Sequence, residues 1–225
     1  MTPVLAAGVG VRRGGAHGLR GGALRSASFR LEARLYGSAA LGIAVEKQDT
    51  ATALIDLLAG LVRPAYGELR VLGEDLTTAR GRAAVRGRIG VARRVARPQH
   101  AFRVRGLVEH AARLARLPSR DRDPLAAAII DRLSLTPWAD VPLRAAPEAV
   151  CRRARLAAAA VHQPDLLLID GLLDDFPPAE TGTLAEVIRD LGRDTTVVAA
   201  GRDAGALALA CGDVLSVTDG VLVRP

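Results

Sequence analysis

The alternation of short apolar runs with segments of helical periodicity constrains the fold more than any other feature of the sequence. Two runs, DLLLID at 165–170 and TTVVAA at 195–200, are nearly continuously apolar. Such runs are typical of strands in a parallel sheet that helices cover on both faces. Between the two runs, Leu184, Ile188 and Leu191 repeat at helical spacing. This order predicts an α/β protein built on a central, mainly parallel sheet.

Further strands are predicted where short apolar runs are bounded by turn residues. The segment 23–32 differs, because Phe29 and Leu31 alternate with polar neighbours, as in a half-exposed antiparallel strand. Residues 106–135 show helical periodicity and no strand pattern, which predicts a helical insert in the α/β core. The other predicted strands are 4–12, 40–45, 67–73, 88–92, 214–217 and 220–223.

Composition narrows the class of protein. A chain of 225 residues, 49% apolar and only 3% aromatic, is long enough for one domain with an aliphatic core. No apolar run reaches the ~18 residues of a membrane span, and the first residues lack the order of a signal peptide, so we expect a cytoplasmic protein. The net charge of +7 rests on arginines with few aromatic residues among them, so we expect no nucleic-acid partner. Cys151 and Cys211 are expected to be buried free thiols.

Four stretches follow one another along the chain: LIDLLAGLVRPAYGELRVLGEDL from residue 54, RIGVARR from 88, CRRARLAAAAVHQPDLLLID from 151 and CGDVLSVTDGVLV from 211. In this order they resemble the ATP-binding cassette (ABC) ATPase domain over nearly the whole chain. The resemblance implies a P-loop NTPase-like ABC cassette core, with a mixed, mainly parallel sheet and an antiparallel β subdomain, plus a helical subdomain. We expect one domain over 1–225, with its core at about 1–100 and 150–225 and its helical subdomain at about 101–149.

The phosphate loop implied by the resemblance falls on residues 45–52, where most of its working groups are replaced. Such a loop needs glycines, so that backbone N–H groups approach the phosphates, and a lysine. Here it has no glycine, Ala51 stands at the lysine position, and only Thr52 fits its role. Glu46 and Asp49 add negative charge, and like charges ~4 Å apart cost about 4 kcal/mol at an effective dielectric of ~20. Tight ATP binding by this route is not expected.

The polar side chains of this loop suggest two local roles. Asp49 or Thr50 is expected to cap the N-terminus of the following helix, where free N–H groups and the helix dipole favour an oxygen. Lys47 is either an exposed, solvated lysine or a substitute that swings back for the missing one.

The resemblance assigns the remaining motifs by position. Walker B keeps its aspartate, Asp170, but the next residue, normally the glutamate that polarises the attacking water, is Gly171. Arg94 stands at the glutamine of the Q-loop, and Arg202 at the switch histidine. The signature motif falls on residues 146–150, which read APEAV. These residues suit the first turn of a helix, but they are poorly suited to bind a γ-phosphate.

Thr52 and Asp170 are therefore the vestigial candidates for nucleotide binding. They are kept either for local hydrogen bonds or for residual contact with Mg²⁺ or nucleotide. No catalytic residue and no metal site are assigned, and no cofactor, neither ATP nor Mg²⁺, is expected.

The leading hypothesis is a pseudo-ATPase: a degenerate ABC subunit with a structural or regulatory role in a transporter complex, peripheral at the inner face of the cell membrane. Its implied partners are a transmembrane subunit and a second ABC subunit, identical or different. Acidic residues of a permease, or anionic headgroups, could meet the arginines near the Q-loop and the helical insert, and the loop after Walker B could mediate pairing. These candidate contact residues are Arg93, Arg94, Arg97, Arg103, Arg105, Asp174 and Asp175.

Two alternatives stay open. The first is a divergent but active ABC ATPase that energises transport by binding Mg·ATP through Thr52, Asp170 and nearby arginines, since arginine also holds phosphate. In that case Asp174 or Asp175 would have to reach the position of the water-activating carboxylate. The second is a soluble binding module unrelated to membranes.

Overall fold

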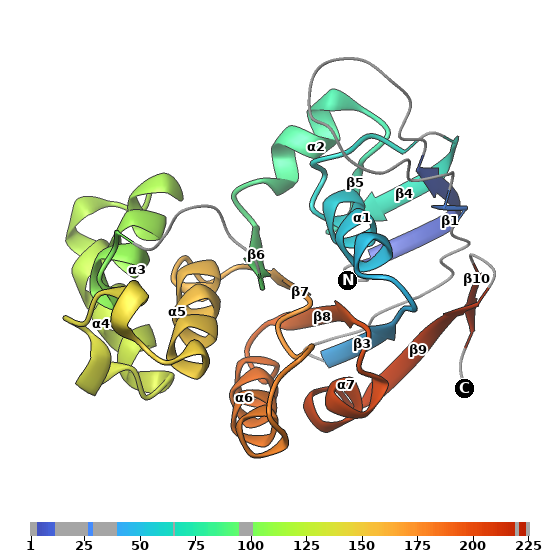
Figure 1. Cartoon of the computed structure of the whole chain (residues 1–225). Coiled ribbons are helices and arrows are strands. Elements are labelled where there is room, and N and C mark those ends of the chain that lie inside the picture. The colour runs from blue at the N-terminus through green and yellow to red at the C-terminus, as the bar shows by residue number, and fades with distance from the viewer. Residues whose placement is uncertain are drawn as a thin grey trace.

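The computed structural model describes residues 4–11, 27–28, 40–64, 66–94, 101–218 and 221–223, which form two sheets surrounded by helices (Figure 1). The strands are β1 Val4–Val11, β2 Ala27–Ser28, β3 Ala40–Ala44, β4 Tyr66–Val71, β5 Glu74–Asp75, β6 Ile89–Arg93, β7 Leu166–Asp170, β8 Thr196–Gly201, β9 Asp213–Thr218 and β10 Val221–Val223. The α-helices are α1 Gln48–Leu58, α2 Ala79–Val85, α3 Val104–Leu114, α4 Ser119–Arg132, α5 Glu148–Ala160, α6 Pro178–Leu191 and α7 Ala204–Ala210, with short 3₁₀ turns at Thr136–Trp138 and Leu143–Ala145.

The larger sheet has the order β10-β9-β3-β8-β7-β6. Its strands from β9 to β6 pair in parallel, and β10 pairs antiparallel with β9 at one edge. Strands β7 and β8 lie inside the sheet, which explains why their sequences are continuously apolar. The predicted α/β class with a mainly parallel sheet is confirmed.

The smaller sheet has the order β2-β1-β4-β5 and is antiparallel throughout. It supplies the antiparallel β subdomain that was predicted. Strand β5 was not predicted, because two residues are too short to show a period. Of the predicted strand 23–32, only β2 falls within the described residues, and Phe29 and Leu31 lie outside them.

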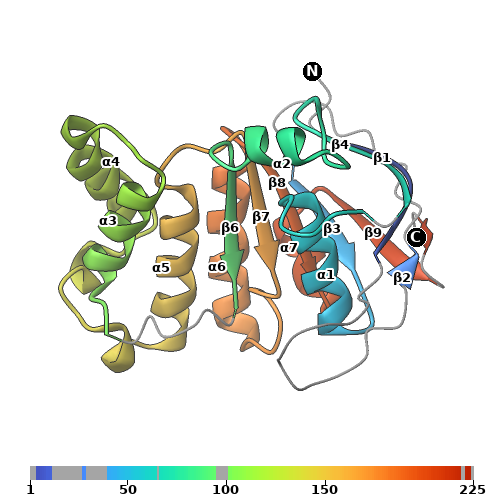
Figure 2. The ribbon, with the colours of Figure 1, turned by 90° about the horizontal axis from the view of Figure 1, so that it is seen from above.

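The larger sheet has a separate apolar core on each face. Leu166 and Leu168 pack with α1 and β4, whereas Leu167 and Ile169 pack with the core that includes α5, α6 and α7. This division follows from the strand period of two, which sends successive side chains to opposite faces. The cores fix α1 against one face of the sheet and α6 and α7 against the other (Figure 2).

Between β6 and β7 the described residues form α3, α4 and α5 and no strand (Figure 2). This is the helical insert that the sequence indicates, although the exact division at about 101–149 stays a prediction. Among the described residues, no helix is long and apolar enough to cross a membrane.

Candidate active site

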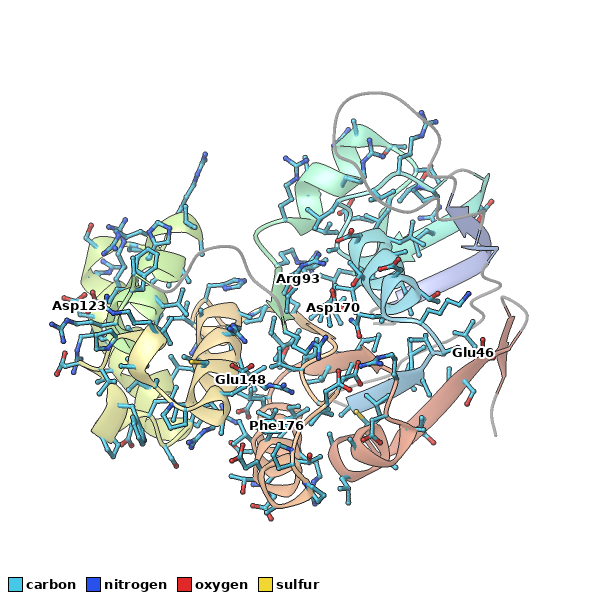
Figure 3. All side chains as sticks on the ribbon, viewed as in Figure 1. Glu46, Arg93, Asp123, Glu148, Asp170 and Phe176 are labelled. Atoms are coloured by element: carbon cyan, nitrogen blue, oxygen red, sulfur yellow. The ribbon has the colours of Figure 1, made fainter. Side chains whose placement is uncertain are left out.

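The residues assigned to the phosphate loop, Walker B, the Q-loop and the switch position gather where strands β3, β6, β7 and β8 end, whereas those of the signature position lie at the start of α5. The carboxyl ends of parallel strands share one edge of a sheet, which is where ligands bind in open α/β folds. Residues 45–47 connect β3 to α1, Arg93 ends β6, and Asp170 ends β7. Figure 3 places Arg93 beside Asp170, with Glu46 apart from both.

Asp170 is the centre of a network of side chains that leaves its carboxylate fully engaged. The residue is only 4% exposed. Its Oδ1 accepts hydrogen bonds from Gln48 Nε2 at 2.7 Å and from Thr52 Oγ1 at 3.1 Å. Its Oδ2 accepts one from Arg93 Nη1 at 3.0 Å, and the same guanidinium also pairs with Asp56 of α1. Both predicted vestigial residues, Thr52 and Asp170, are therefore in direct contact.

Burial raises the pKa of Asp170, and the nearby carboxylate of Asp56 acts in the same direction. The hydrogen bonds from Thr52 and Gln48 and the positive charge of Arg93 lower that pKa and partly offset the burial. The net result is a pKa above the ordinary value of an aspartate, with the three donors acting against the effect of burial.

Gly171, at the position of the water-activating glutamate, has a backbone that favours glycine and a neighbour that fills the space. Its φ is +62°, in the left-handed region. A Cβ added there would lie 2.6 Å from Gln48 Nε2 and 2.9 Å from Gln48 Oε1. The amide of Gln48 thus occupies the room that a side chain at position 171 would need. Its Oε1 is buried and has no hydrogen-bond partner among the described residues.

A second network joins the loop after β7 to the residues that follow β8 and β6. Asp174 is 1% exposed, and its Oδ1 accepts the backbone N–H groups of Arg202 at 2.8 Å and Asp203 at 3.1 Å. Asp175 pairs with Arg94 at 2.6 Å and with Arg202. The arginines at the Q-loop and switch positions are therefore held by the two aspartates that follow Walker B.

The start of α1 differs from the prediction. Lys47 is the N-cap in an extended conformation, and its carbonyl accepts the N–H groups of Thr50 and Ala51. No side chain caps the helix, so the expected cap by Asp49 or Thr50 is wrong. The helix begins at Gln48, two or three residues earlier than that cap requires, because the extended loop ends at Lys47. Asp49 lies in the first turn, where its charge still favours the helix dipole.

Arg152 of α5 is a residue that sequence reasoning missed. It is 4% exposed, donates to the carbonyls of Leu172 at 2.7 Å and Asp174 at 2.8 Å, and pairs with Glu148 at 3.0 Å. Its guanidinium also lies 4.2 Å from the centre of the Phe176 ring. Arg152 therefore ties the signature-position helix to the loop after Walker B. The spacing of four residues from Glu148 signals a helical ion pair, but nothing local indicates the burial.

The predicted contact arginines do not form one patch among the described residues. Arg93 and Arg94 belong to the two networks above. Arg103 donates to the backbone carbonyl of Asp140, and Arg105 lies 3.5 Å from the carboxylate of the same residue. Arg97 lies outside the described residues. Contact of these arginines, or of Asp174 and Asp175, with a partner stays a prediction.

Comparison with known proteins bears on the fold. No protein-family model matches the chain. It is 27% identical over 175 residues to the methionine import ATP-binding protein MetN 2 of Burkholderia mallei, and equally to that of Burkholderia pseudomallei. The matches cover 76% of this chain but only 44% of each relative, so the chain spans less than half the length of the curated relatives it matches.

Solved structures extend the agreement to the whole chain. It superposes on CbiO1 of Clostridium perfringens, part of the ABC transporter complex CbiONQ, with a TM-score of 0.81 over 99% of this chain and 87% of CbiO1, at 14% identity. The chain therefore has the fold of the ABC ATP-binding cassette. A protein described as an inward-facing ABC transporter of the metal-chelate type gives a TM-score of 0.78 at 16% identity, over 100% of this cassette and 83% of that chain.

The residues of this cassette fit a magnesium-bound triphosphate poorly. Glu46 and Asp49 are exposed beside the start of α1, where the phosphates would lie. The carboxylate that would face the metal is already bonded to Gln48, Thr52 and Arg93. No cluster of three or more histidine, cysteine, aspartate or glutamate side chains suited to a metal occurs in the described part of the chain.

Proposed function

We propose that this ABC cassette does not hydrolyse ATP and acts as a structural or regulatory subunit of a transporter complex. The observation that carries the proposal is the engagement of Asp170 by Gln48, Thr52 and Arg93. These donors take the place that Mg²⁺ and its ligands would need. The relatives are named as ATP-binding proteins, and the proposal is that this chain has kept their fold without their chemistry.

The energetics support a closed site. A magnesium ion beside Asp170 would displace Arg93 from it, and a side chain at position 171 would displace Gln48. Each hydrogen bond to a charged group contributes about 1.5–3 kcal/mol. The contribution of Arg93 falls toward the lower end of that range, because its side chain is 26% exposed. The loop then offers the acidic side chains of Glu46 and Asp49, and Ala51 stands where a phosphate-binding lysine would offset these losses.

The missing carboxylate has no ready substitute. Asp174 is buried and bound to two backbone N–H groups, while Asp175 is paired with Arg94 and Arg202. A general base must reach the water it activates within hydrogen-bond distance and with a free oxygen. Asp174 Oδ2 makes no hydrogen bond among the described residues, but the residue is 1% exposed, and Asp175 is held by two arginines through one of its oxygens. The proposal is that neither carboxylate is placed to activate a water in this arrangement.

The proposed partners follow from the family. CbiO1 is part of the complex CbiONQ, and we propose that this cassette likewise docks on a transmembrane subunit, at the inner face of the membrane. A second cassette, identical or different, is the other proposed partner, with Gly171 to Pro177 as the loop that mediates pairing.

One observation favours a second candidate, an active but divergent ATPase. Thr52 and Asp170 still lie 3.1 Å apart, as two groups that share a magnesium ion would. If the ion displaced Gln48 and Arg93, this pair could hold Mg·ATP. The third hypothesis, a binding module unrelated to membranes, has no comparable observation in its favour.

Phosphate release from Mg·ATP by the purified chain tests the proposal. The wild type is compared with Asp170→Ala and with Asp165→Ala, a control at the opposite end of β7 whose carboxylate is 53% exposed. We expect all three to show only the background rate. Hydrolysis by the wild type and Asp165→Ala that is abolished in Asp170→Ala would establish the second candidate instead.

A further inference from the structure

Helix α2 is packed tightly on the side of the larger sheet that α1 covers (Figure 1). Its buried residues, Gly81 and Val85, are four positions apart and therefore share one face of the helix. A Cβ added at Gly81 would lie 2.0 Å from the carbonyl oxygen of Asp75, so the helix approaches the end of β5 closely. Thr78 caps the helix by accepting the N–H of Gly81 at 3.0 Å. The opposite face of α2 is thus held in place and exposed to solvent.

This exposed face is basic and continues onto the turn after α1. Arg80 and Arg86 are exposed on α2 and at its C-cap, and Arg63 is exposed on the turn. None of the three makes an ion pair within the described residues. Arg82 donates to two backbone carbonyls, at 2.9 and 3.1 Å, so its charge is not neutralised by them. A Cβ added at Gly60 would lie 3.4 Å from Arg82 Cγ, which shows that the turn contacts α2.

The sequence around this surface contains no acidic residue. Segments 57–67 and 76–88 hold five arginines and no aspartate or glutamate. Within the described part of the chain, only one of these arginines forms an ion pair, Arg88 with Asp165. The surface therefore carries excess positive charge and favours an anionic ligand.

An exposed leucine adds an apolar group to the same surface. Leu61, the residue after Gly60 in the turn, is 59% exposed. The other exposed residues of α2 and its C-terminal end are small, so they leave the arginines accessible to a flat surface; they are Ala79, Ala83, Ala84 and Gly87. We define the α2 patch as Leu61, Arg63, Arg80, Arg82 and Arg86.

We infer that the α2 patch binds the surface of a membrane that contains anionic phospholipids. Such a surface offers negative headgroups to the arginines and an apolar layer beneath them to the leucine. Nucleic acid is the less suitable ligand, because segment 76–88 contains no aromatic side chain on which bases could stack. The inference deepens the proposed location at the inner face of the membrane and rests on the proposed function only for that location. It requires neither nucleotide nor a transmembrane subunit.

The test is co-sedimentation of the purified full chain with lipid vesicles. Phosphatidylcholine vesicles with about 30% phosphatidylglycerol are compared with vesicles of phosphatidylcholine alone. At about 0.1 M salt we expect the partition coefficient to be at least about tenfold higher for the anionic vesicles. Most of this difference should disappear at about 1 M salt, where charges are screened over a few ångströms.

Two triple variants with the same change in net charge locate the binding surface. The first replaces Arg63, Arg80 and Arg86 by glutamine and keeps Arg82, which holds two backbone carbonyls. The control replaces three other exposed arginines that make no ion pair within the described residues, Arg113, Arg144 and Arg189. Each arginine near an anionic surface contributes about fivefold to binding. The partition coefficient should therefore fall about a hundredfold in the first variant and less than about fivefold in the control.

A matched pair of leucine variants tests the apolar contact. Leu61→Ser should weaken binding to the anionic vesicles by about tenfold, because a serine gains little from the apolar layer. Leu209→Ser should leave binding within about twofold, since Leu209 is similarly exposed, at 52%, but belongs to α7 on the other face of the sheet.

Equal losses in the two triple variants, or no binding to the anionic vesicles at about 0.1 M salt, would overturn the inference. Tighter binding to duplex DNA than to the vesicles at the same salt would also overturn it and would assign the α2 patch to nucleic acid. Urea denaturation of each variant checks that it is folded. These results do not depend on ATP hydrolysis, so the vesicle assay can fail while the proposed loss of catalysis stands, and the reverse.

Discussion

Replacing Gly171 by alanine should destabilise the protein, because the site accommodates Gln48 only when position 171 has no side chain. The φ of +62° disfavours any Cβ, at about 1 kcal/mol. The new Cβ would also lie 2.6 Å from Gln48 Nε2. Gln48 has to turn away, and its hydrogen bond to the carboxylate of Asp170 is lost.

The magnitude follows from these two effects. A hydrogen bond to a charged group contributes about 1.5–3 kcal/mol, so the sum for Gly171→Ala is about 2.5–4 kcal/mol of unfolding free energy. In a Gln48→Ala background the hydrogen bond is already absent and the clash is relieved. The same glycine substitution should then cost only about 1 kcal/mol, a coupling within the range for residues in contact.

Urea denaturation of the four proteins of this cycle measures both numbers. Gly182→Ala is the matched control, since a Cβ there meets nothing within 4 Å and the residue lies inside α6. That variant should gain about 0.5–1 kcal/mol. If Gly171→Ala lost less than about 1 kcal/mol, or lost the same amount in both backgrounds, the account of Gln48 filling this space would be wrong.

Three further outcomes are expected. Arg152→Met should lower the unfolding free energy by about 2–4 kcal/mol in urea denaturation, because the buried carbonyls of Leu172 and Asp174 lose their donor. A loss under ~0.5 kcal/mol would contradict the view that Arg152 stabilises the loop after β7. Burial lowers the pKa of His162, so below pH ~6.5 the unfolded chain binds a proton that the folded chain does not, and stability should fall as the pH drops. Thermal melts of His162→Gln should show a smaller fall in stability over the same pH range. An equal fall would show that His162 is not the group responsible. Burial raises the pKa of Cys211 to about 12, so its thiol should not react with Ellman's reagent at pH 8 until the protein unfolds. The Cys151→Ser variant leaves Cys211 as the only thiol, and its rapid reaction in the folded state would contradict this expectation.

The fold was predictable because its signals are local. The continuous apolar runs of β7 and β8 and the helical spacing in α6 indicate a covered parallel sheet before any long-range contact is known. The two-residue strand β5 carries no period. The start of α1 depends on the extended backbone of Lys47, which the side-chain pattern does not encode.

The site was predictable only where a motif position could be matched. Thr52 and Asp170 are found by position, and the structure brings them together. The donors that close the site are different, because Gln48 and Asp170 are 122 residues apart in the chain and Arg93 reaches the same carboxylate from another strand. Such contacts arise from the topology of the sheet, so a single sequence does not indicate them.

The central claim, that this cassette's own side chains fill its nucleotide site, is tested most directly by isothermal titration of the purified chain with Mg·ATP. The account predicts no saturable heat up to millimolar nucleotide, for the wild type and for Asp170→Asn alike. Saturable binding to the wild type with a submillimolar Kd, lost in Asp170→Asn, would contradict it.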